Sequence, residues 1–311
     1  MRKYNNILVV VEPKRERQVA LERAIEIGRY NPNITITVLR LIYDFSYDIH
    51  ILNRHKAQET RDDVTNTHLE SVKQLIAEYG KDSEVKLIPK VIWAKDLGQG
   101  IVDEMNSGAY DLLVKGANHH GILDSIIFTP VDWYVLRNAQ IPVVIAKEHD
   151  WSEHGNIVVA LDFASEEKRL FNVSVLREAQ MLSKVTGGTI HLVNSAPVIL
   201  PTIMLEAPNY APEIYAENVI KEHKKHLLAF AKQHNIPEEN CHIAEGMPDD
   251  VIPNMCRKLS PQAVFIGSAG RQGISAALIG NTCEEIVDYI EADLFVLNRR
   301  TLSKELEKKE D

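Results

Sequence analysis

Three glycines with a fixed spacing form the part of this sequence best suited to binding chemistry. Gly267, Gly270 and Gly280 are followed by Asn281 and Thr282, in the pattern G-x2-G-x9-G-N-T. Glycine lets the backbone approach a ligand closely, and the first turn of a helix presents unbonded N–H groups and the positive end of its dipole. The segment therefore predicts an anion site in which main-chain donors hold a phosphate group.

A carboxylate and a cation complete this candidate site. Asp162 directly follows the apolar run 156–161, which we expect to be a buried parallel strand. At the tip of that strand, Asp162 would stand across from the glycine segment. Arg271 lies inside the segment and is included in the predicted site.

Simpler interpretations of the same residues stay open. Thr282 and Glu285 have the spacing of a capping box, so Thr282 can serve only to start a helix, and the acidic residues after it would repel phosphate. Asp162 precedes Ser165, a good helix N-cap, and can belong to a polar loop. The glycine segment is then either a nucleotide site or a vestige of one.

The chain repeats itself, and this repeat sets the elements that must position the site. The apolar run 6–11 recurs at 156–161, an offset of 150 residues. Two later pairs of runs, 112–116 with 264–267 and 142–145 with 294–297, recur in the same order at about that spacing. A chain of 311 residues has room for two domains at about 150 residues each. We therefore predict two copies of one domain, at 1–148 and 155–300, with a charged tail at 301–311.

Within each copy, strands alternate with amphipathic helices. Five βα units of this kind predict an α/β fold of two tandem flavodoxin-like domains, each a five-stranded parallel sheet with helices on both faces. Ligands then bind beyond the carboxyl ends of the strands, here between the first and the fourth. In the first copy we expect strands at 5–11, 34–41, 84–92, 111–115 and 141–146, and helices at 15–30, about 56–79, 98–107 and 130–138.

The glycine pattern, the strand-tip Asp162 and the βα order together resemble the universal stress protein family, in its tandem form. The resemblance implies that Asp162 and Val193, at the end of the second strand, hold the adenine end of ATP or another adenine nucleotide, and that the glycine loop holds phosphate without a metal. It implies an internal pseudo-dimer through 141–146 and 293–298, with a further homodimer left open. It also implies a cytoplasmic stress-response role that includes tolerance of DNA-damaging conditions.

The first copy departs from the family pattern at the matching positions. His119 and Thr129 replace the second and third glycines, and Pro130 removes an N–H donor from the helix start. Glu12 replaces the aspartate and is one methylene longer. We predict that this copy does not bind nucleotide as the family does.

Composition narrows the remaining functions. The net charge of −9 disfavours direct nucleic-acid binding, and three cysteines favour a reducing compartment. No apolar run has the length of a membrane span, so we expect a cytoplasmic protein. His223 and His226 share a helix face but lack the further ligands of a standard metal site.

The sequence contains none of the common hydrolase or nucleotide-triphosphatase motifs. We therefore expect a non-enzymatic module that senses a ligand and is read by an unidentified protein partner. Two alternatives stay open: slow nucleotide hydrolysis, and transport of an apolar or acyl-bearing ligand by the proline-punctuated segment 196–208.

Overall fold

The computed structural model divides the chain into two units, with the boundary between Glu148 and His149. Each unit is described by itself. The residues that the structure describes are 4–13, 15–29, 31, 33–44, 54–117, 129–197, 212–268 and 289–298.

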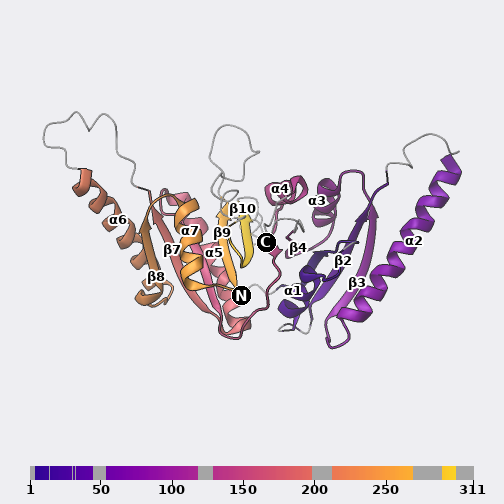
Figure 1. Ribbon diagram of the computed structural model, residues 1–311, viewed down its shortest axis with the longest axis horizontal. Helices are drawn as coiled ribbons and strands as arrows, with labels where there is room; N and C mark the ends of the chain where they lie inside the picture. Colours follow the sequence, from indigo (N-terminus) through magenta and orange to yellow (C-terminus); the bar gives the residue numbers. More distant parts are fainter. Residues whose placement is uncertain are drawn as a thin grey trace, which may run out of the picture. The chain divides into compact units, whose positions relative to one another are not determined.

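A parallel sheet in the order β3-β2-β1-β4-β5 forms the centre of the first unit (Figure 1). Its strands are buried apolar runs, as expected for a sheet covered on both faces. The elements in chain order are β1 (Asn6–Val10), α1 (Val19–Gly28), β2 (Thr35–Ile42), α2 (Arg54–Tyr79), β3 (Lys86–Trp93), α3 (Leu97–Ser107), β4 (Leu112–Gly116), α4 (Pro130–Asn138) and β5 (Val143–Ala146).

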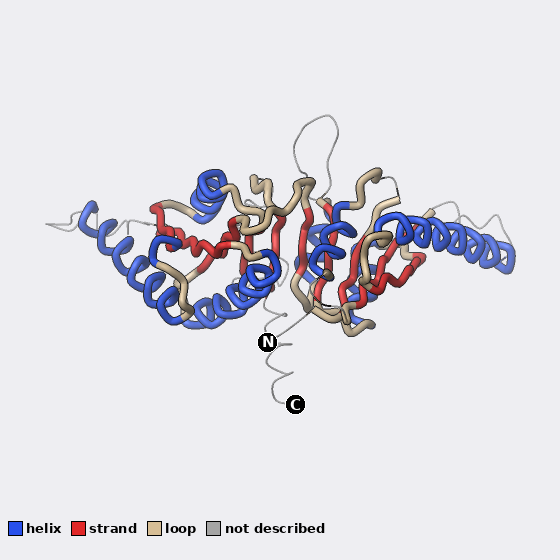
Figure 2. Tube along the Cα trace, turned by 90° about the horizontal axis from the view of Figure 1, so that it is seen from below, coloured by secondary structure: helices blue, strands red, loops and turns tan. Residues whose placement is uncertain are grey.

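The second unit has the same strand arrangement, β8-β7-β6-β9-β10, and neighbouring strands within it pair in parallel. Figure 2 shows helices on both sides of the strands in each unit. The elements are β6 (Asn156–Leu161), α5 (Glu166–Thr186), β7 (Thr189–Ala196), α6 (Pro212–Gln233), the short 3-10 helix η3 (Glu238–Asn240), β8 (Cys241–Glu245), α7 (Pro248–Leu259), β9 (Ala263–Ser268) and β10 (Asp293–Asn298).

The predicted doubly wound α/β architecture is confirmed. In each unit the first strand lies between the second and the fourth, so strand order reverses between β1 and β4 and between β6 and β9. Right-handed crossovers that run outward in both directions from this point place successive helices on opposite faces and leave a crevice at the carboxyl ends of these strands. The predicted pairing of 141–146 with 293–298 stays a prediction.

The first helix begins later than the sequence predicts, at Val19 instead of residue 15. The residues before it form a loop that the buried Gln18 holds in place. The Gln18 amide accepts a hydrogen bond from Glu12 N and donates to the carbonyls of Glu12 and Arg15, at 2.8–3.1 Å. A side chain that bonds to the preceding loop stabilises a non-helical backbone there, because it satisfies groups that a helix would otherwise pair.

Two histidines meet on neighbouring strands of the second unit. His191 Nδ1 lies 3.0 Å from His242 Nε2, and His191 Nε2 lies 3.2 Å from Asn156 Oδ1. Burial lowers the pKa of both rings, and the neighbouring His242 lowers the pKa of His191 further. The chain of hydrogen bonds therefore favours two neutral imidazoles over a pair of adjacent cations.

We expect the second unit to lose stability as the pH falls below about 6.5. The folded pKa values lie below the ordinary value, so the unfolded chain takes up protons first. The stabilisation is present above the unfolded pKa and is lost as the pH falls through the lowered folded values. Hydrogen exchange of β7 and β8 amides against pH measures this loss.

His242→Gln should flatten that pH dependence in part, since burial also lowers the pKa values of His223 and His234 in this unit. His154→Gln is the matched control, because His154 is exposed and bonds to the Gly187 carbonyl. A pH dependence in His242→Gln as steep as in the unaltered protein would contradict the prediction.

Candidate functional site

In the first unit, a buried lysine joins the carboxyl ends of the first and fourth strands. Lys115 Nζ lies 2.8 Å from Asp132 Oδ1 and 3.3 Å from Glu12 Oε1. The Lys115 and Asp132 side chains are only 6% and 2% exposed, so each charge depends on the other for stabilisation. Asp132 also completes a capping box with Thr129 at the start of α4, which confirms the predicted helix start at Pro130.

A second cation lies over the end of β4. A Cβ atom added at Gly116 would lie 2.5 Å from Arg15 Nη1, and the Arg15 guanidinium bonds to Glu148 Oε1 at 2.9 Å. Gly116 therefore makes room for an arginine of the same unit. The sequence analysis did not single out Arg15, because its only signal was its position in the loop after the first strand.

The matching strand ends of the second unit carry a different arrangement. Asp162 is 53% exposed on its side chain. Its backbone is held by Asn172, which accepts from Asp162 N and donates to Asp162 O at 3.1 and 2.9 Å. Its carboxylate accepts from Ala164 N at 2.9 Å and pairs with Lys168. Asp162 thus stands at the strand tip as predicted, with a carboxylate open to solvent.

The residue that matches Lys115 in the second unit is apolar. The apolar runs 112–116 and 264–267 align Lys115 with Ile266, which is 5% exposed. The second unit therefore has no cation at this position that could form an ion pair like that of Lys115 and Asp132. The two units therefore differ in charge at matching strand positions.

A polar network lies beside Asp162, between β7 and α6. The Asn194 side chain donates to Leu161 O at 2.8 Å, and its Oδ1 lies 2.9 Å from His223 Nδ1. Burial lowers the pKa of His223, although the charge of Asp162 raises it in part. His226, one turn on, lies 3.2 Å from an Arg169 nitrogen. The spacing of the two histidines predicted that they share a helix face, but their partners, Asn194 and Arg169, lie on other elements.

Two more predicted site residues lie inside strands. Val193 is 1% exposed and lies three residues before the end of β7, paired in register with Ala160 and His242. Gly267 lies in β9, where an added Cβ would lie 2.6 Å from the ring of Phe171 on α5. Helix packing by itself therefore explains the glycine at 267. The contributions of Val193 and Gly267 to ligand binding stay predictions.

The remaining predicted site residues lie outside the described residues. These are Gly270, Arg271, Gly280, Asn281 and Thr282. His119 of the first copy and most of the apolar segment 196–208 also lie outside them.

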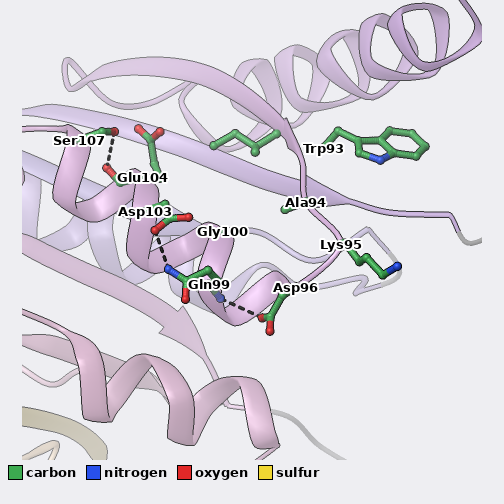
Figure 3. Close-up of a pocket in the computed structure, with 10 residues that line it drawn as sticks. Trp93, Ala94, Lys95, Asp96, Gln99, Gly100, Asp103, Glu104 and Ser107 are labelled. Carbon is green, nitrogen blue, oxygen red and sulfur yellow. Dashed lines mark hydrogen bonds between the residues drawn. The ribbon is translucent and has the colours of Figure 1, made fainter. Parts of the chain in front are cut away.

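A pocket of about 450 Å³ opens in the first unit between the end of β3 and the start of α3 (Figure 3). Sequence analysis did not predict it. Its carboxylates are occupied by the protein: Asp96 caps α3 through Gln99 N, Asp103 accepts from the Gln99 amide at 2.6 Å, and Glu104 pairs with Lys90 at 2.6 Å.

Two negative findings apply to the described part of the chain. No three histidine, cysteine, aspartate or glutamate side chains there are grouped so that they could hold a metal ion. In the same ranges, no helix has both the length and the apolar character needed to cross a membrane.

The chain is a tandem of two doubly wound α/β units, a class of fold in which ligands bind where the strand order reverses. The two units carry different polar groups at these matching strand ends. The chain belongs to the universal stress protein family, whose model matches residues 3–147 and again 153–298.

Named relatives share nearly the whole chain. It is 33% identical over 301 residues to universal stress protein E of Escherichia coli K12, which covers 96% of this chain and 95% of the relative. It is 31% identical to the universal stress protein E homolog of Haemophilus influenzae, over 94% of this chain and 96% of the homolog.

Solved structures agree with the fold. A functionally unknown protein from Pseudomonas aeruginosa PAO1 is similar with a TM-score of 0.74 and 26% identity, over 98% of this chain and 96% of that one. A universal stress protein from Archaeoglobus fulgidus, 18% identical, covers 96% of this chain and all of its own with a TM-score of 0.64. At that identity the likeness concerns the fold.

Proposed function

We propose that this chain is a ligand-sensing protein of a cytoplasmic stress response, which binds ATP or another adenine nucleotide in its second domain only. Bound ligand shifts a surface that a protein partner reads, and the response aids tolerance of DNA-damaging conditions. The activity is binding without turnover. The domains are those proposed from the sequence, 1–148 and 155–300.

The observation that carries this proposal is the contrast at the strand ends. In the first unit, Lys115 joins Glu12 and Asp132 at the place where a nucleotide would enter. In the second unit, Ile266 takes the place of the lysine and the Asp162 carboxylate is 53% exposed. The Asp162 carboxylate pairs with Lys168 only at the exposed surface, where a ligand hydroxyl or amino group can replace this partner at little cost, whereas replacing the buried ion pair of the first unit is costly.

Calorimetric titration with ATP tests the proposal by a matched pair of variants. Asp162→Ala should weaken ATP binding by at least about tenfold, since the lost charge-assisted hydrogen bond is worth about 1.5–3 kcal/mol. Glu12→Ala, the same change in the first unit, should leave the affinity unchanged. Equal losses in both variants, or none in either, would refute the assignment to the second domain.

The glycine loop is tested separately with Gly270→His, which introduces the histidine of the first copy at the matching position. We expect it to abolish ATP binding. Native mass spectrometry of freshly purified protein then separates the alternatives. A retained nucleotide supports the proposal, and a retained lipid-like mass supports the carrier. ATP turnover that is lost in Asp162→Ala while binding persists would indicate a hydrolase.

A further inference from the structure

A buried arginine that pairs with no carboxylate of the described residues lies near the carboxyl end of β2 in the first unit. Arg40 is 5% exposed, and its Nη1 donates to Ser71 Oγ on α2 at 2.9 Å. Its Nε is buried and has no hydrogen-bond partner. No carboxylate among the described residues pairs with it. Burial lowers the pKa of Arg40.

This arginine interrupts a strand that is otherwise built for burial. The residues around it in β2 are apolar, and Leu39 and Ile42 are buried. A guanidinium in such a strand is costly unless an anion and further hydrogen bonds compensate it. Among the described residues, the first unit therefore holds a positive charge near the end of β2 that no carboxylate pairs with.

The second unit shows how the fold resolves the same position without a charge. Asn194 on β7 pairs in register with Leu161, the residue before Asp162. On β2, the Leu39 carbonyl accepts from the backbone N–H of the residue before Glu12, and Arg40 is the next residue of the strand. Arg40 and Asn194 therefore occupy matching positions in the two units. Asn194 is satisfied at both of its polar atoms, by Leu161 O and by His223. Both polar atoms of the uncharged Asn194 side chain are therefore hydrogen-bonded, whereas the charged Arg40 side chain keeps an Nε donor without a partner.

The Nε of Arg40 is a donor without a partner, from which an anion can accept a hydrogen bond. With Nη1 bonded to Ser71, the Nε edge of the guanidinium is left, which is the side that makes two parallel bonds to carboxylate or phosphate. Ser71 is exposed and its Oγ lies 2.9 Å from Arg40 Nη1, so an anion that accepts from the Ser71 hydroxyl lies next to the guanidinium. His68 is on α2, the helix that carries Ser71, and the positive charge of Arg40 lowers the pKa of His68 beyond the effect of burial.

We propose that Arg40 and Ser71 of the first unit bind a small oxyanion, a phosphate or carboxylate group, between β2 and α2. The site is separate from the proposed nucleotide site of the second domain. Its ligand compensates the buried guanidinium and adds a hydrogen bond from the Ser71 hydroxyl. The first copy is then a binding domain with its own ligand chemistry.

Thermal unfolding of the full chain with inorganic phosphate, with acetate and with chloride at equal ionic strength tests this site. We expect phosphate or acetate, but not chloride, to raise the unfolding midpoint of the first unit by about 3 °C at saturating concentrations. Arg40→Met should abolish the rise and should unfold no earlier than the unaltered protein without anion. Arg17→Met, which removes an exposed arginine paired with Glu22, should keep the rise.

A measurement on the unaltered protein keeps the test independent of folding defects. Bound phosphate should raise the pKa of His68, followed by NMR of its ring, because the anion offsets the charge of Arg40. The proposal is overturned if neither anion shifts the midpoint or the His68 titration. It is also overturned if Arg17→Met removes the response as fully as Arg40→Met.

Discussion

Lys115→Met is expected to lower the free energy of unfolding of the first unit by about 3 kcal/mol or more. Methionine keeps most of the length of the lysine but removes the ammonium group from beside the Asp132 carboxylate, which is 2% exposed. A carboxylate in that environment loses its ionic compensation and cannot recover it from water. Hydrogen exchange of the β1 and β4 amides measures the loss in this unit separately from the other.

Lys73→Met is the matched control for this change. Lys73 pairs with Glu70 at 2.7 Å, but both side chains are at least half exposed. A pair of this kind on a helix surface contributes about 0.3–0.5 kcal/mol. Lys73→Met should therefore leave the hydrogen exchange of the β1 and β4 amides nearly unchanged. A loss below about 1 kcal/mol in Lys115→Met would contradict this expectation and would show that Asp132 is stabilised by its other partners.

Gly267→Ala is expected to destabilise the second unit by about 2 kcal/mol. The added methyl carbon would lie 2.6 and 2.9 Å from two atoms of the Phe171 ring, and 3.2 Å from Val175. Phe171 is 4% exposed and packed in the core, so the ring cannot move aside without disturbing its neighbours. Thermal unfolding measures this loss, and hydrogen exchange of the β9 amides assigns it to the second unit.

Gly116→Ala makes the same change at the matching position of the first unit and should cost less than about 1 kcal/mol. Its close contact is the tip of the Arg15 side chain, which can rotate toward solvent. Equal destabilisation in both variants would contradict the packing explanation. If Gly267→Ala binds ATP normally once folded, the first glycine of the motif serves the sheet–helix contact, and ligand binding depends on the later residues.

Much of the fold was determined by local sequence. The runs 6–11 and 156–161 predicted the central strands, because continuous apolar residues suit only a sheet covered on both faces. The start of α4 at Pro130 followed from Thr129 and Asp132, which are close in sequence and form their capping box locally. The late start of α1 was missed, because Gln18 stabilises the loop through bonds that helix periodicity does not reveal.

By itself, the sequence determined the duplication, the α/β architecture and the position of Asp162 at a strand tip. These features depend on periodicity, spacing and capping, which act over a few residues. Only the tertiary structure showed that Lys115 meets Asp132 and Glu12, that Arg15 covers Gly116, and that Arg40 is buried without a carboxylate partner in the described residues. Such contacts join residues far apart in the chain, and burial, which sets the energy of each charge, exists only once the sheet and helices have packed.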